Sequence, residues 1–360
     1  MSRYSKLFPK TNPLQYANFF ACCPEILLEG KNGFLAENLD GTILMRKMLI
    51  TGATGFIGRN LAEYFASQPD FEVYGTYFSS PPLDHSNIRM LHANLTERAD
   101  VQRVIEGKDI VIQAAAITAG IQHVAQNPHS IIADNAIMNS LIFNSCYDHH
   151  ISHVILFSCA IMYHSSKEPL KEIDFDANKE IYPNYFGGAW NKIYFEKICE
   201  FYASLGMNKY TAIRHSNIYG PYDKYDLEKS HVFGATITKV MTTTNGKISV
   251  WGAGEEERDL LHISDLVRFV ELAILKQEKP FELYNVGYGR SISIKNLVRE
   301  IINCSGKDLD IEHDLSKPSN KTTVSLDCSK AKKDLGWQPE LSLKKGIRHT
   351  LEWYKNREKK

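Results

Sequence analysis

The amino-acid sequence predicts an α/β fold, with a doubly wound parallel sheet and a smaller C-terminal α/β substrate lobe. Three observations predict it. Short apolar runs alternate with segments of helical periodicity from Lys47 onward, one run is apolar on both faces, and a glycine triplet joins the first run to the first helix. Alternating strands and helices fold into parallel sheets with right-handed crossovers. The 360 residues suffice for two domains or one large α/β unit.

The strands are expected where apolar runs of strand length are bounded by polar residues or glycine. They are residues 48–50, 71–78, 88–92, 109–115 and 153–157. The fourth run is apolar on both faces, as a parallel strand between two helical layers must be. The helical segments between and after them are residues 60–67, 101–105, 131–147 and 189–205. After about Asn217 the regular alternation loosens, which indicates a smaller lobe that faces a substrate.

The same pattern predicts the domain boundaries. We expect an N-terminal extension of unknown role in residues 1–44, a dinucleotide-binding domain in 45–216, and a mainly substrate-binding lobe in 217–360, of which 258–278 return to the first domain. The extension has no apolar core followed by a small-residue cleavage site, so a secretory signal is not expected. It is either a leader packed on the surface or an addition upstream of a working domain that begins near Met45.

Composition and charge exclude several classes of protein. Apolar residues make up 43% of the chain and charged residues 23%, which is ordinary for a globular protein and unlike a disordered one. The 42 basic residues balance the 42 acidic ones, so no nucleic-acid partner is expected. Every apolar run is shorter than the roughly 18 residues of a membrane span. Seven scattered cysteines, an odd number, indicate a reduced, cytoplasmic protein, and no metal site is expected.

A glycine triplet, Gly52, Gly55 and Gly58, lies at the first strand-to-helix turn. In Rossmann domains such glycines allow a tight turn, close approach of the backbone to a pyrophosphate, and close packing of helix on strand. The N-terminus of the following helix attracts phosphate. The sequence therefore predicts a dinucleotide site at this turn. The residues expected to line it are Gly52, Thr54, Gly55, Phe56, Ile57, Gly58 and Arg59.

The end of the second strand bears on which dinucleotide binds. A carboxylate there would hold the ribose 2′-hydroxyl of NAD. The strand instead ends with Thr76, Tyr77 and Phe78, followed by two serines, and none of these residues is an acid. A neutral strand end with Arg59 nearby can accept a 2′-phosphate. The sequence thus favours NADP, with NAD as the alternative. If NAD is the cofactor, Arg59 does no more than cap the surface of its helix.

Several segments together resemble the extended short-chain dehydrogenase/reductase family, also called the NAD-dependent epimerase/dehydratase family. They are the glycine spacing, the three alanines that begin at Ala114, and the segment from Asn217 to Pro221. Within the family the chain is most similar to the GDP-L-fucose synthase branch. The segments that resemble this branch are residues 114–121, 220–223, 230–232, 250–254, 258–263, 316–318 and 335–337. The resemblance runs from about Met45 to the C-terminus.

This resemblance implies a reaction on a nucleoside-diphosphate 4-keto sugar, which is epimerised beside the ketone and then reduced with hydride from NADPH. The family uses a Ser or Thr, a Tyr, and a Lys four residues after the Tyr. The Tyr hydroxyl exchanges a proton with the sugar oxygen, while the Lys binds the nicotinamide ribose and lowers the Tyr pKa. Lys192 matches this lysine, and His231 matches a histidine of the branch that can act as an acid or base.

The resemblance also implies the remaining binding residues. Further cofactor contacts are expected at Asn94, Ala114, Ala115, Lys192 and His215. Substrate contacts are expected at Asn217, His231, Arg258 and Lys317. Arg258 and Lys317 suit a diphosphate, because an anionic ligand needs fixed cations where water is excluded. Alternatively, both are solvated surface charges.

The chain departs from the family pattern at three positions. Gly188 stands where the phenol belongs, Cys159 where the hydroxyl belongs, and Ile161 where the branch has an acid/base cysteine. A thiol donates hydrogen bonds more weakly than a hydroxyl, and isoleucine does not titrate. Tyr185 lies seven residues before Lys192, which predicts a place two helical turns away on a similar face.

Three interpretations of these departures stay open. Gly187 and Gly188 remove side-chain bulk and are expected to loosen the start of the helix. The space could then hold Tyr185, Tyr163, water or the substrate. Either a displaced tyrosine transfers the proton, or the chemistry needs no tyrosine there, or the protein binds its ligand with little turnover. The catalytic set expected on this basis is Lys192, Cys159, Tyr185 and His231.

The helical segments 131–147 and 189–205 are apolar on more than one face. In the family, the equivalent helices pair across a two-fold axis into a four-helix bundle. Helices with excess apolar surface seek a partner, and closed two-fold pairing is the commonest outcome. A homodimer is therefore expected.

Overall fold

A computed structural model describes residues 26–30, 33–37, 45–117, 127, 129, 131–227, 230–316 and 322–357. The chain divides into two compact units, Met1–Met45 and Arg46–Lys360. In the first unit, β1 (Ile26–Gly30) and β2 (Gly33–Glu37) form an antiparallel pair. The predicted site residue Lys317 lies outside the described residues.

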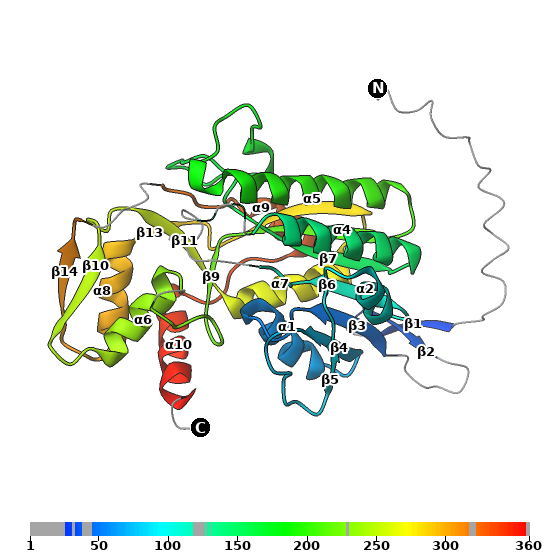
Figure 1. Ribbon diagram of the computed structural model, residues 1–360, viewed down its shortest axis with the longest axis horizontal. Coiled ribbons are helices and arrows are strands. Elements are labelled where there is room, and N and C mark those ends of the chain that lie inside the picture. The colour runs from blue at the N-terminus through cyan, green and yellow to red at the C-terminus, as the bar shows by residue number, and fades with distance from the viewer. Residues whose placement is uncertain are drawn as a thin grey trace. The chain divides into compact units, whose positions relative to one another are not determined.

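The second unit is built on a seven-stranded parallel sheet, and this confirms the predicted doubly wound fold (Figure 1). Its strands are β3 (Arg46–Thr51), β4 (Phe71–Tyr77), β5 (Ile88–His92), β6 (Ile110–Gln113), β7 (His153–Cys159), β8 (Lys209–His215) and β12 (Phe281–Val286). Their order is β12-β8-β7-β6-β3-β4-β5. The order reverses at β3, and ligands of such sheets bind at the carboxyl ends of the strands beside this switch point.

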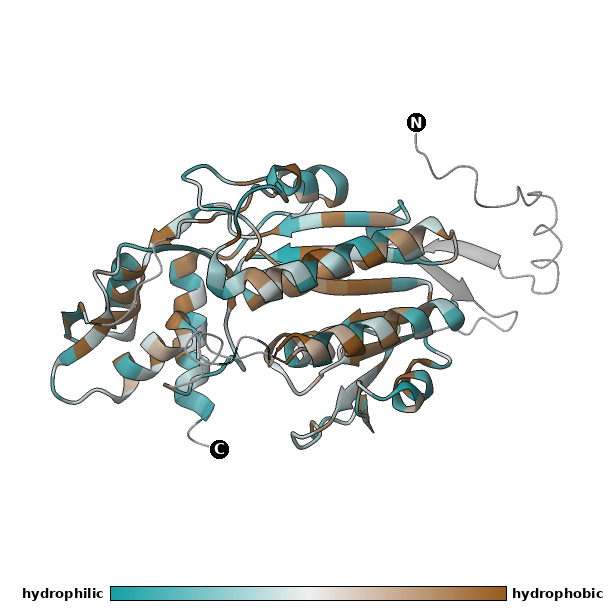
Figure 2. Ribbon diagram, turned by 45° about the horizontal axis from the view of Figure 1, so that its top comes forward, coloured by the Kyte–Doolittle hydropathy of each residue, from teal (hydrophilic) through white to brown (hydrophobic). Residues whose placement is uncertain are grey.

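Helices cover both faces of the large sheet (Figure 1). One layer contains α1 (Phe56–Ala66), α7 (Ile263–Lys276) and α9 (Ser329–Leu335). The other contains α2 (Arg98–Ile105), α4 (Ala133–Asp148) and α5 (Phe186–Ser204). Figure 2 shows apolar residues along the central strands between these layers. No helix among the described residues is long and apolar enough to cross a membrane.

The remaining elements form a smaller lobe with its own core. A three-stranded sheet has the order β13-β11-β9, and a separate parallel pair joins β10 to β14. These strands are β9 (Asn217–Tyr219), β10 (Lys247–Trp251), β11 (Glu257–His262), β13 (Ser291–Ser293) and β14 (Asp310–Asp314). The helices are α6 (Val232–Thr242), α8 (Ile294–Ser305) and α10 (Leu343–Arg357). Between β11 and β13 the chain returns to the large sheet as α7 and β12.

Two features of the large domain differ from the sequence prediction. The strands β8 and β12 lie outside the predicted set, and β8 carries the polar residues Arg214 and His215 near its end. Arg214 forms a buried ion pair with Glu196. A charged residue in the sequence argues against an interior strand, although most residues of β8 are buried.

The start of α5 also differs. The helix begins at Phe186, before Gly187 and Gly188, so the expected loosening of the helix start is wrong. A Cβ on Gly187 would lie 3.1 Å from Ile132 Cδ1. The absence of a side chain at this position therefore lets α5 pack closely against the residues that precede α4.

Candidate functional site

The glycine turn after β3 is held in a shape that only glycine permits. Gly52 has a φ of +62°, and a Cβ on it would lie 2.7 Å from Ala115 Cα. A Cβ on Gly58 would lie 2.2 Å from the carbonyl oxygen of Gly52. Gly55 caps α1, whose first N–H groups have no acceptor within the helix. The turn thus leaves a side-chain-free cradle at a helix N-terminus, which fits the pyrophosphate of a dinucleotide.

Thr51 joins this turn to the strand end beside it. Its hydroxyl oxygen accepts hydrogen bonds from the N–H groups of Ala114 (3.1 Å) and Ala115 (3.2 Å). The same hydroxyl donates to the side chain of Gln113. These bonds hold Ala114 and Ala115 against Gly52, so the structure brings together the predicted residues that follow β3 and β6.

Replacing Gly58 with alanine is expected to lower the free energy of unfolding by about 1–3 kcal/mol, because the new methyl group overlaps a backbone carbonyl. Dinucleotide affinity should fall about tenfold or more, since the turn must shift away from the phosphate position. Thermal unfolding and a fluorescence titration with NADPH measure the two effects.

Gly188→Ala is the matched control for this substitution. Its Cβ would lie 3.6 Å from Ile161 Cδ1, an ordinary contact, and alanine is favoured over glycine in a helix by about 1 kcal/mol. The control should leave stability equal or higher. Equal losses in both variants would contradict the proposed cause.

Arg59 lies in the first turn of α1 and is already engaged. Its Nε lies 2.8 Å from Glu63 Oε1, and its guanidinium carbon lies 3.9 Å from the centre of the Tyr222 ring. The side chain of the next residue, Asn60, donates to the carbonyl of Pro221 at 2.9 Å. A 2′-phosphate that binds Arg59 would therefore compete with the Glu63 carboxylate.

Asn94 follows β5 and organises the turn into α2. Its side-chain oxygen accepts hydrogen bonds from Thr96 N (3.2 Å) and Thr96 Oγ1 (2.8 Å). Its backbone N–H donates to Asp100 Oδ2 at 2.8 Å. The amide oxygen is thus committed to the turn, and only its amino group is left for a ligand.

The carboxyl ends of β7 and β8 bring three predicted residues together. Cys159 and His215 are register partners in the parallel ladder, and the N–H of Ala160 donates to the His215 carbonyl at 3.1 Å. Lys192 reaches the same edge from α5, where its Nζ donates to the Phe157 carbonyl at 2.7 Å. A cation, a thiol and an imidazole therefore share one edge of the sheet.

Burial and charge set the protonation of this group. Burial raises the pKa of the Cys159 thiol, although the positive charge of Lys192 opposes the shift. The pKa of His215 is lowered to about 4, mainly by burial and in addition by the charges of Lys192 and His231. The hydrogen bond with the Ser216 carbonyl acts in the opposite direction and raises the pKa. At neutral pH the thiol is protonated and the His215 imidazole is neutral.

The region beside Gly188 is apolar on the sides that the structure describes. A Cβ on Gly188 would point toward the methyl groups of Ile161 (3.6 Å) and Ile131 (4.0 Å). Tyr185 has helical backbone angles and directly precedes α5, at the end of a short turn that begins at Pro183. Its ring packs with Tyr182 and against the buried cluster around Met162. Its expected role in proton transfer stays a prediction.

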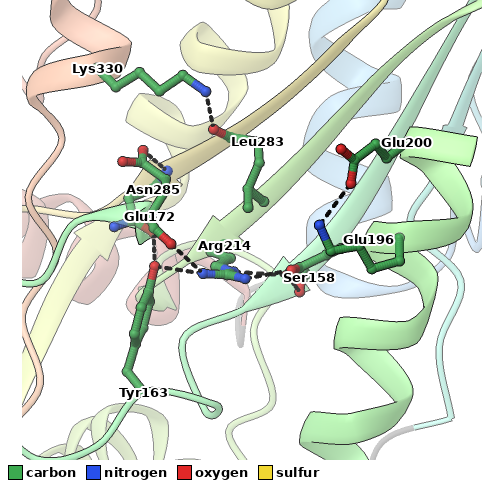
Figure 3. Close-up of polar contacts among 10 residues, drawn as sticks. Ser158, Tyr163, Glu172, Glu196, Glu200, Arg214, Leu283, Asn285 and Lys330 are labelled. Carbon is green, nitrogen blue, oxygen red and sulfur yellow. Dashed lines mark hydrogen bonds and ion pairs between the residues drawn. The ribbon is translucent and has the colours of Figure 1, made fainter. Parts of the chain in front are cut away.

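Tyr163 is not a substitute for the missing phenol. Its hydroxyl donates to Asn285 Oδ1 at 2.8 Å and accepts a hydrogen bond from the Arg214 guanidinium at 2.9 Å (Figure 3). The side chain is buried, and burial raises its pKa to about 12. The prediction that Tyr163 could fill the space beside Gly188 is therefore wrong.

Tyr163 belongs to a buried polar network that the sequence analysis missed (Figure 3). Glu196 receives two hydrogen bonds from Arg214, at 2.9 and 2.6 Å, and one from Ser158 at 2.6 Å. Glu196 lies one helical turn after Lys192, and Arg214 immediately precedes His215. The network thus fixes α5 against β7 and β8 beside the lysine and the imidazole.

The smaller lobe positions the expected substrate residues. Asn217 Nδ2 donates to the Asp259 carbonyl at 3.1 Å, which joins β9 to β11. The Arg258 guanidinium donates to the carbonyls of Glu257 (2.7 Å) and Thr322 (2.9 Å) and remains half-buried. His231 is exposed immediately before α6. The structure brings Asn217 and Arg258 to adjacent strands.

Asp259 is a second residue that the sequence analysis missed. Its carboxylate is 1% exposed and accepts the N–H groups of Tyr288 (2.7 Å), Gly289 (3.1 Å) and Leu326 (3.1 Å). It therefore ties the loop after β12 to β11 directly beside Arg258. In the sequence, Asp259 is distinguished only as an acid adjacent to Arg258. This position assigns it no role until the fold is known.

Known proteins resemble this chain along most of its length. Residues 48–287 match the family described as "NAD dependent epimerase/dehydratase family". The chain is 29% identical to a GDP-L-fucose synthase of Azorhizobium caulinodans, over 86% of this chain and 96% of the relative. It is 27% identical to a GDP-L-colitose synthase of Yersinia pseudotuberculosis, over 86% and 98%.

A solved structure gives the same fold. UDP-glucose 4-epimerase of Thermotoga maritima, crystallised with UDP-glucose, superposes with a TM-score of 0.74 at 23% identity. The superposition covers 86% of this chain and 99% of that chain.

Proposed function

Because the chain belongs to the NAD-dependent epimerase/dehydratase family, we propose that it is an NAD(P)-dependent enzyme that epimerises or reduces a nucleoside-diphosphate 4-keto-hexose-type sugar. The observation that carries the proposal is the position of Lys192. Its ammonium group lies at the carboxyl end of β7, on the edge of the sheet that holds the glycine turn. Ligands of open α/β sheets bind along this edge.

We assign the residues of this site as follows. The glycine turn would hold the pyrophosphate, and Lys192 the nicotinamide ribose. Ala114 and Ala115 would line the dinucleotide where Thr51 holds them against the turn. The bound dinucleotide would supply or accept hydride at the sugar. The substrate would meet Asn217, Arg258 and His231 in the smaller lobe, with Lys317 as a further contact.

NADP is the proposed cofactor, because β4 ends at Tyr77 without an acid that could hold a ribose 2′-hydroxyl. Arg59→Ala is expected to weaken NADPH binding about tenfold and to leave NADH binding unchanged, since a charge-assisted hydrogen bond contributes about 1.5–3 kcal/mol. Titration of both cofactors by protein fluorescence measures the ratio.

Glu63→Gln is the control for this substitution, because it removes the carboxylate that competes for Arg59. It should keep or tighten NADPH binding. If Arg59→Ala weakens the binding of NADPH and of NADH equally, Arg59 does not contact the 2′-phosphate, and the assignment of NADP as cofactor loses its support.

A panel of GDP-, dTDP-, UDP- and CDP-4-keto sugars tests the function. The enzyme should consume NADPH or incorporate solvent deuterium beside the ketone with at least one of them. The second candidate is a nucleotide-sugar binding protein with little turnover, which the replacement of the phenol by Gly188 favours. Saturable binding of the sugars without either signal would establish that alternative and exclude the enzyme.

A homodimer through α4 and α5 forms part of the proposal. These two helices pack on each other, and they keep large apolar side chains exposed, among them Ile137 (45%), Tyr194 (54%) and Phe201 (52%). Tyr194 and Phe201 are seven residues apart and so share a face of α5. Light scattering that shows a monomer at micromolar concentration would contradict the dimer. A cytoplasmic location and the absence of a nucleic-acid partner stay predictions.

A further inference from the structure

The site needs a group that can exchange a proton with the sugar, and the usual positions lack one. Gly188 has no side chain, and Ile161 does not titrate. Burial raises the pKa of the Cys159 thiol, so the thiol is protonated at neutral pH and cannot accept a proton. The Tyr163 hydroxyl is occupied by Asn285 and Arg214. Among the described residues, the neighbours of Lys192 therefore remain.

His215 is the titratable group that the sheet places beside the altered positions. It is the last residue of β8, it pairs in register with Cys159, and its ring lies 6.2 Å from the ring of Phe157 between centroids. Phe157 is also the residue whose carbonyl accepts the Lys192 ammonium. The imidazole thus stands on the strand next to the one where the family pattern expects its hydroxyl.

The hydrogen bonds of His215 define which nitrogen can act. Nδ1 lies 2.8 Å from the Ser216 carbonyl oxygen, which can only accept, so Nδ1 carries the proton. In a neutral imidazole the lone pair then lies on Nε2. Within the described part of the chain, no hydrogen bond engages Nε2, and His215 is only partly buried. Nε2 is thus left for a ligand.

We propose that His215 is a catalytic residue in which Nε2 exchanges a proton with the reacting oxygen of the sugar, in place of the tyrosine that Gly188 has replaced. This inference rests on the proposed nucleotide-sugar reaction. The Ser216 carbonyl holds the tautomer, and the network of Arg214 and Glu196 holds the strand end that carries the imidazole.

The proton step balances in both directions. When a sugar hydroxyl is oxidised, its O–H bond breaks and the proton passes to Nε2. The electron pair of that bond forms the second C–O bond as the carbon loses hydride, which the bound dinucleotide would accept. When the ketone is reduced, the dinucleotide would return the hydride to the carbon, and the oxygen takes the proton back from Nε2.

Burial and the neighbouring groups set the protonation of His215. Burial is the main cause of its lowered pKa, and the charge of Lys192 on α5 and that of protonated His231 before α6 add to this effect. Cys159 is its neutral neighbour on β7. Nε2 is therefore unprotonated at neutral pH, and the imidazolium is a strong donor when the proton returns.

His215→Asn tests the proposal, because the asparagine amide can still donate to the Ser216 carbonyl while Nε2 is lost. We expect kcat to fall at least about 100-fold, the usual contribution of general acid–base catalysis, with KM for the sugar unchanged. Lys197→Met, which changes an exposed lysine on the same helix as Lys192, is the control and should keep the wild-type kcat. Wild-type turnover in His215→Asn, or an equal loss of turnover in the control, would overturn the proposal.

Nitrogen-15 NMR of labelled histidine gives a readout that does not depend on turnover. In the wild-type protein, the signal that disappears in His215→Asn should show a protonated Nδ1 and an unprotonated Nε2 at neutral pH. The opposite tautomer, or an imidazolium, would overturn the proposal. If the wild type neither binds NADPH nor converts any sugar, the proposed function itself fails. If it does both and the variant does too, only the role of His215 fails.

Discussion

Arg214→Met is expected to lower the free energy of unfolding by about 3–5 kcal/mol, because it leaves the Glu196 carboxylate unpaired in the protein interior. Both side chains of this ion pair are only 4% exposed, and their closest atoms are 2.6 Å apart. The guanidinium also donates to the Tyr163 hydroxyl and to the Glu172 carbonyl. Its loss therefore leaves Glu196, Tyr163 and Glu172 without a hydrogen-bond donor that they have in the wild type. Proteins of this kind are stable by roughly 5–15 kcal/mol, so the variant should be marginal.

Urea unfolding followed by circular dichroism measures the change. The double variant Arg214→Met/Glu196→Met should recover much of the loss, since replacing both charges of a buried pair is often neutral. Lys197→Met is the control, because Lys197 and Glu200 form an exposed pair on the same helix and such pairs contribute about 0–1 kcal/mol. A loss for Arg214→Met as small as that of the control would contradict the structural role of the network.

Lys192→Met should abolish most of the turnover with little effect on stability. Its ammonium group lies at the end of β7 beside Cys159 and His215, where the proposed site places the nicotinamide ribose. Removing a fixed charge from such a position costs about 100- to 1,000-fold in kcat. The loss of its hydrogen bond to the Phe157 carbonyl costs only about 1 kcal/mol.

Steady-state kinetics with the sugar found in the panel, together with a titration of NADPH, measures both effects of Lys192→Met. Lys197→Met serves again as the control, since it removes a lysine from the same helix on an exposed position. Wild-type kcat in Lys192→Met would exclude the proposed site while leaving the family membership untouched.

The local parts of this molecule could be predicted from the sequence. The glycine turn depends on three residues within seven positions, and its fit to the structure follows from backbone geometry alone. The strands β3 to β7 are apolar runs, and the structure has each of them within a few residues of its predicted ends. Local spacing and hydrophobicity contain the information for both features.

The polar interior could not be predicted in the same way. Arg214 and Glu196 are 18 residues apart in the chain, and Tyr163 and Asn285 are 122 apart. Each looks like a surface residue until its partner is known, because buried polar groups are tolerated only as satisfied sets. The strand β8 was missed for this reason.

The surroundings of Tyr185 show a second limit. Its ring packs with Tyr182 and against the cluster around Met162, and its spacing to Lys192 predicts neither contact. The pairing of Cys159 with His215 depends on the order of two strands, which no periodicity in the sequence reveals.

The first turn of α1 has a wider consequence for the engineering of this protein. Arg59 stacks on Tyr222 and Asn60 bonds to Pro221, so the helix that would bind phosphate also touches the segment leading into the smaller lobe. In the proposed site, the same helix would contact the dinucleotide and support the segment that leads to the sugar. Redesign of coenzyme preference at Arg59 is therefore expected to alter the fit of the sugar as well, and libraries for either trait should be screened for both.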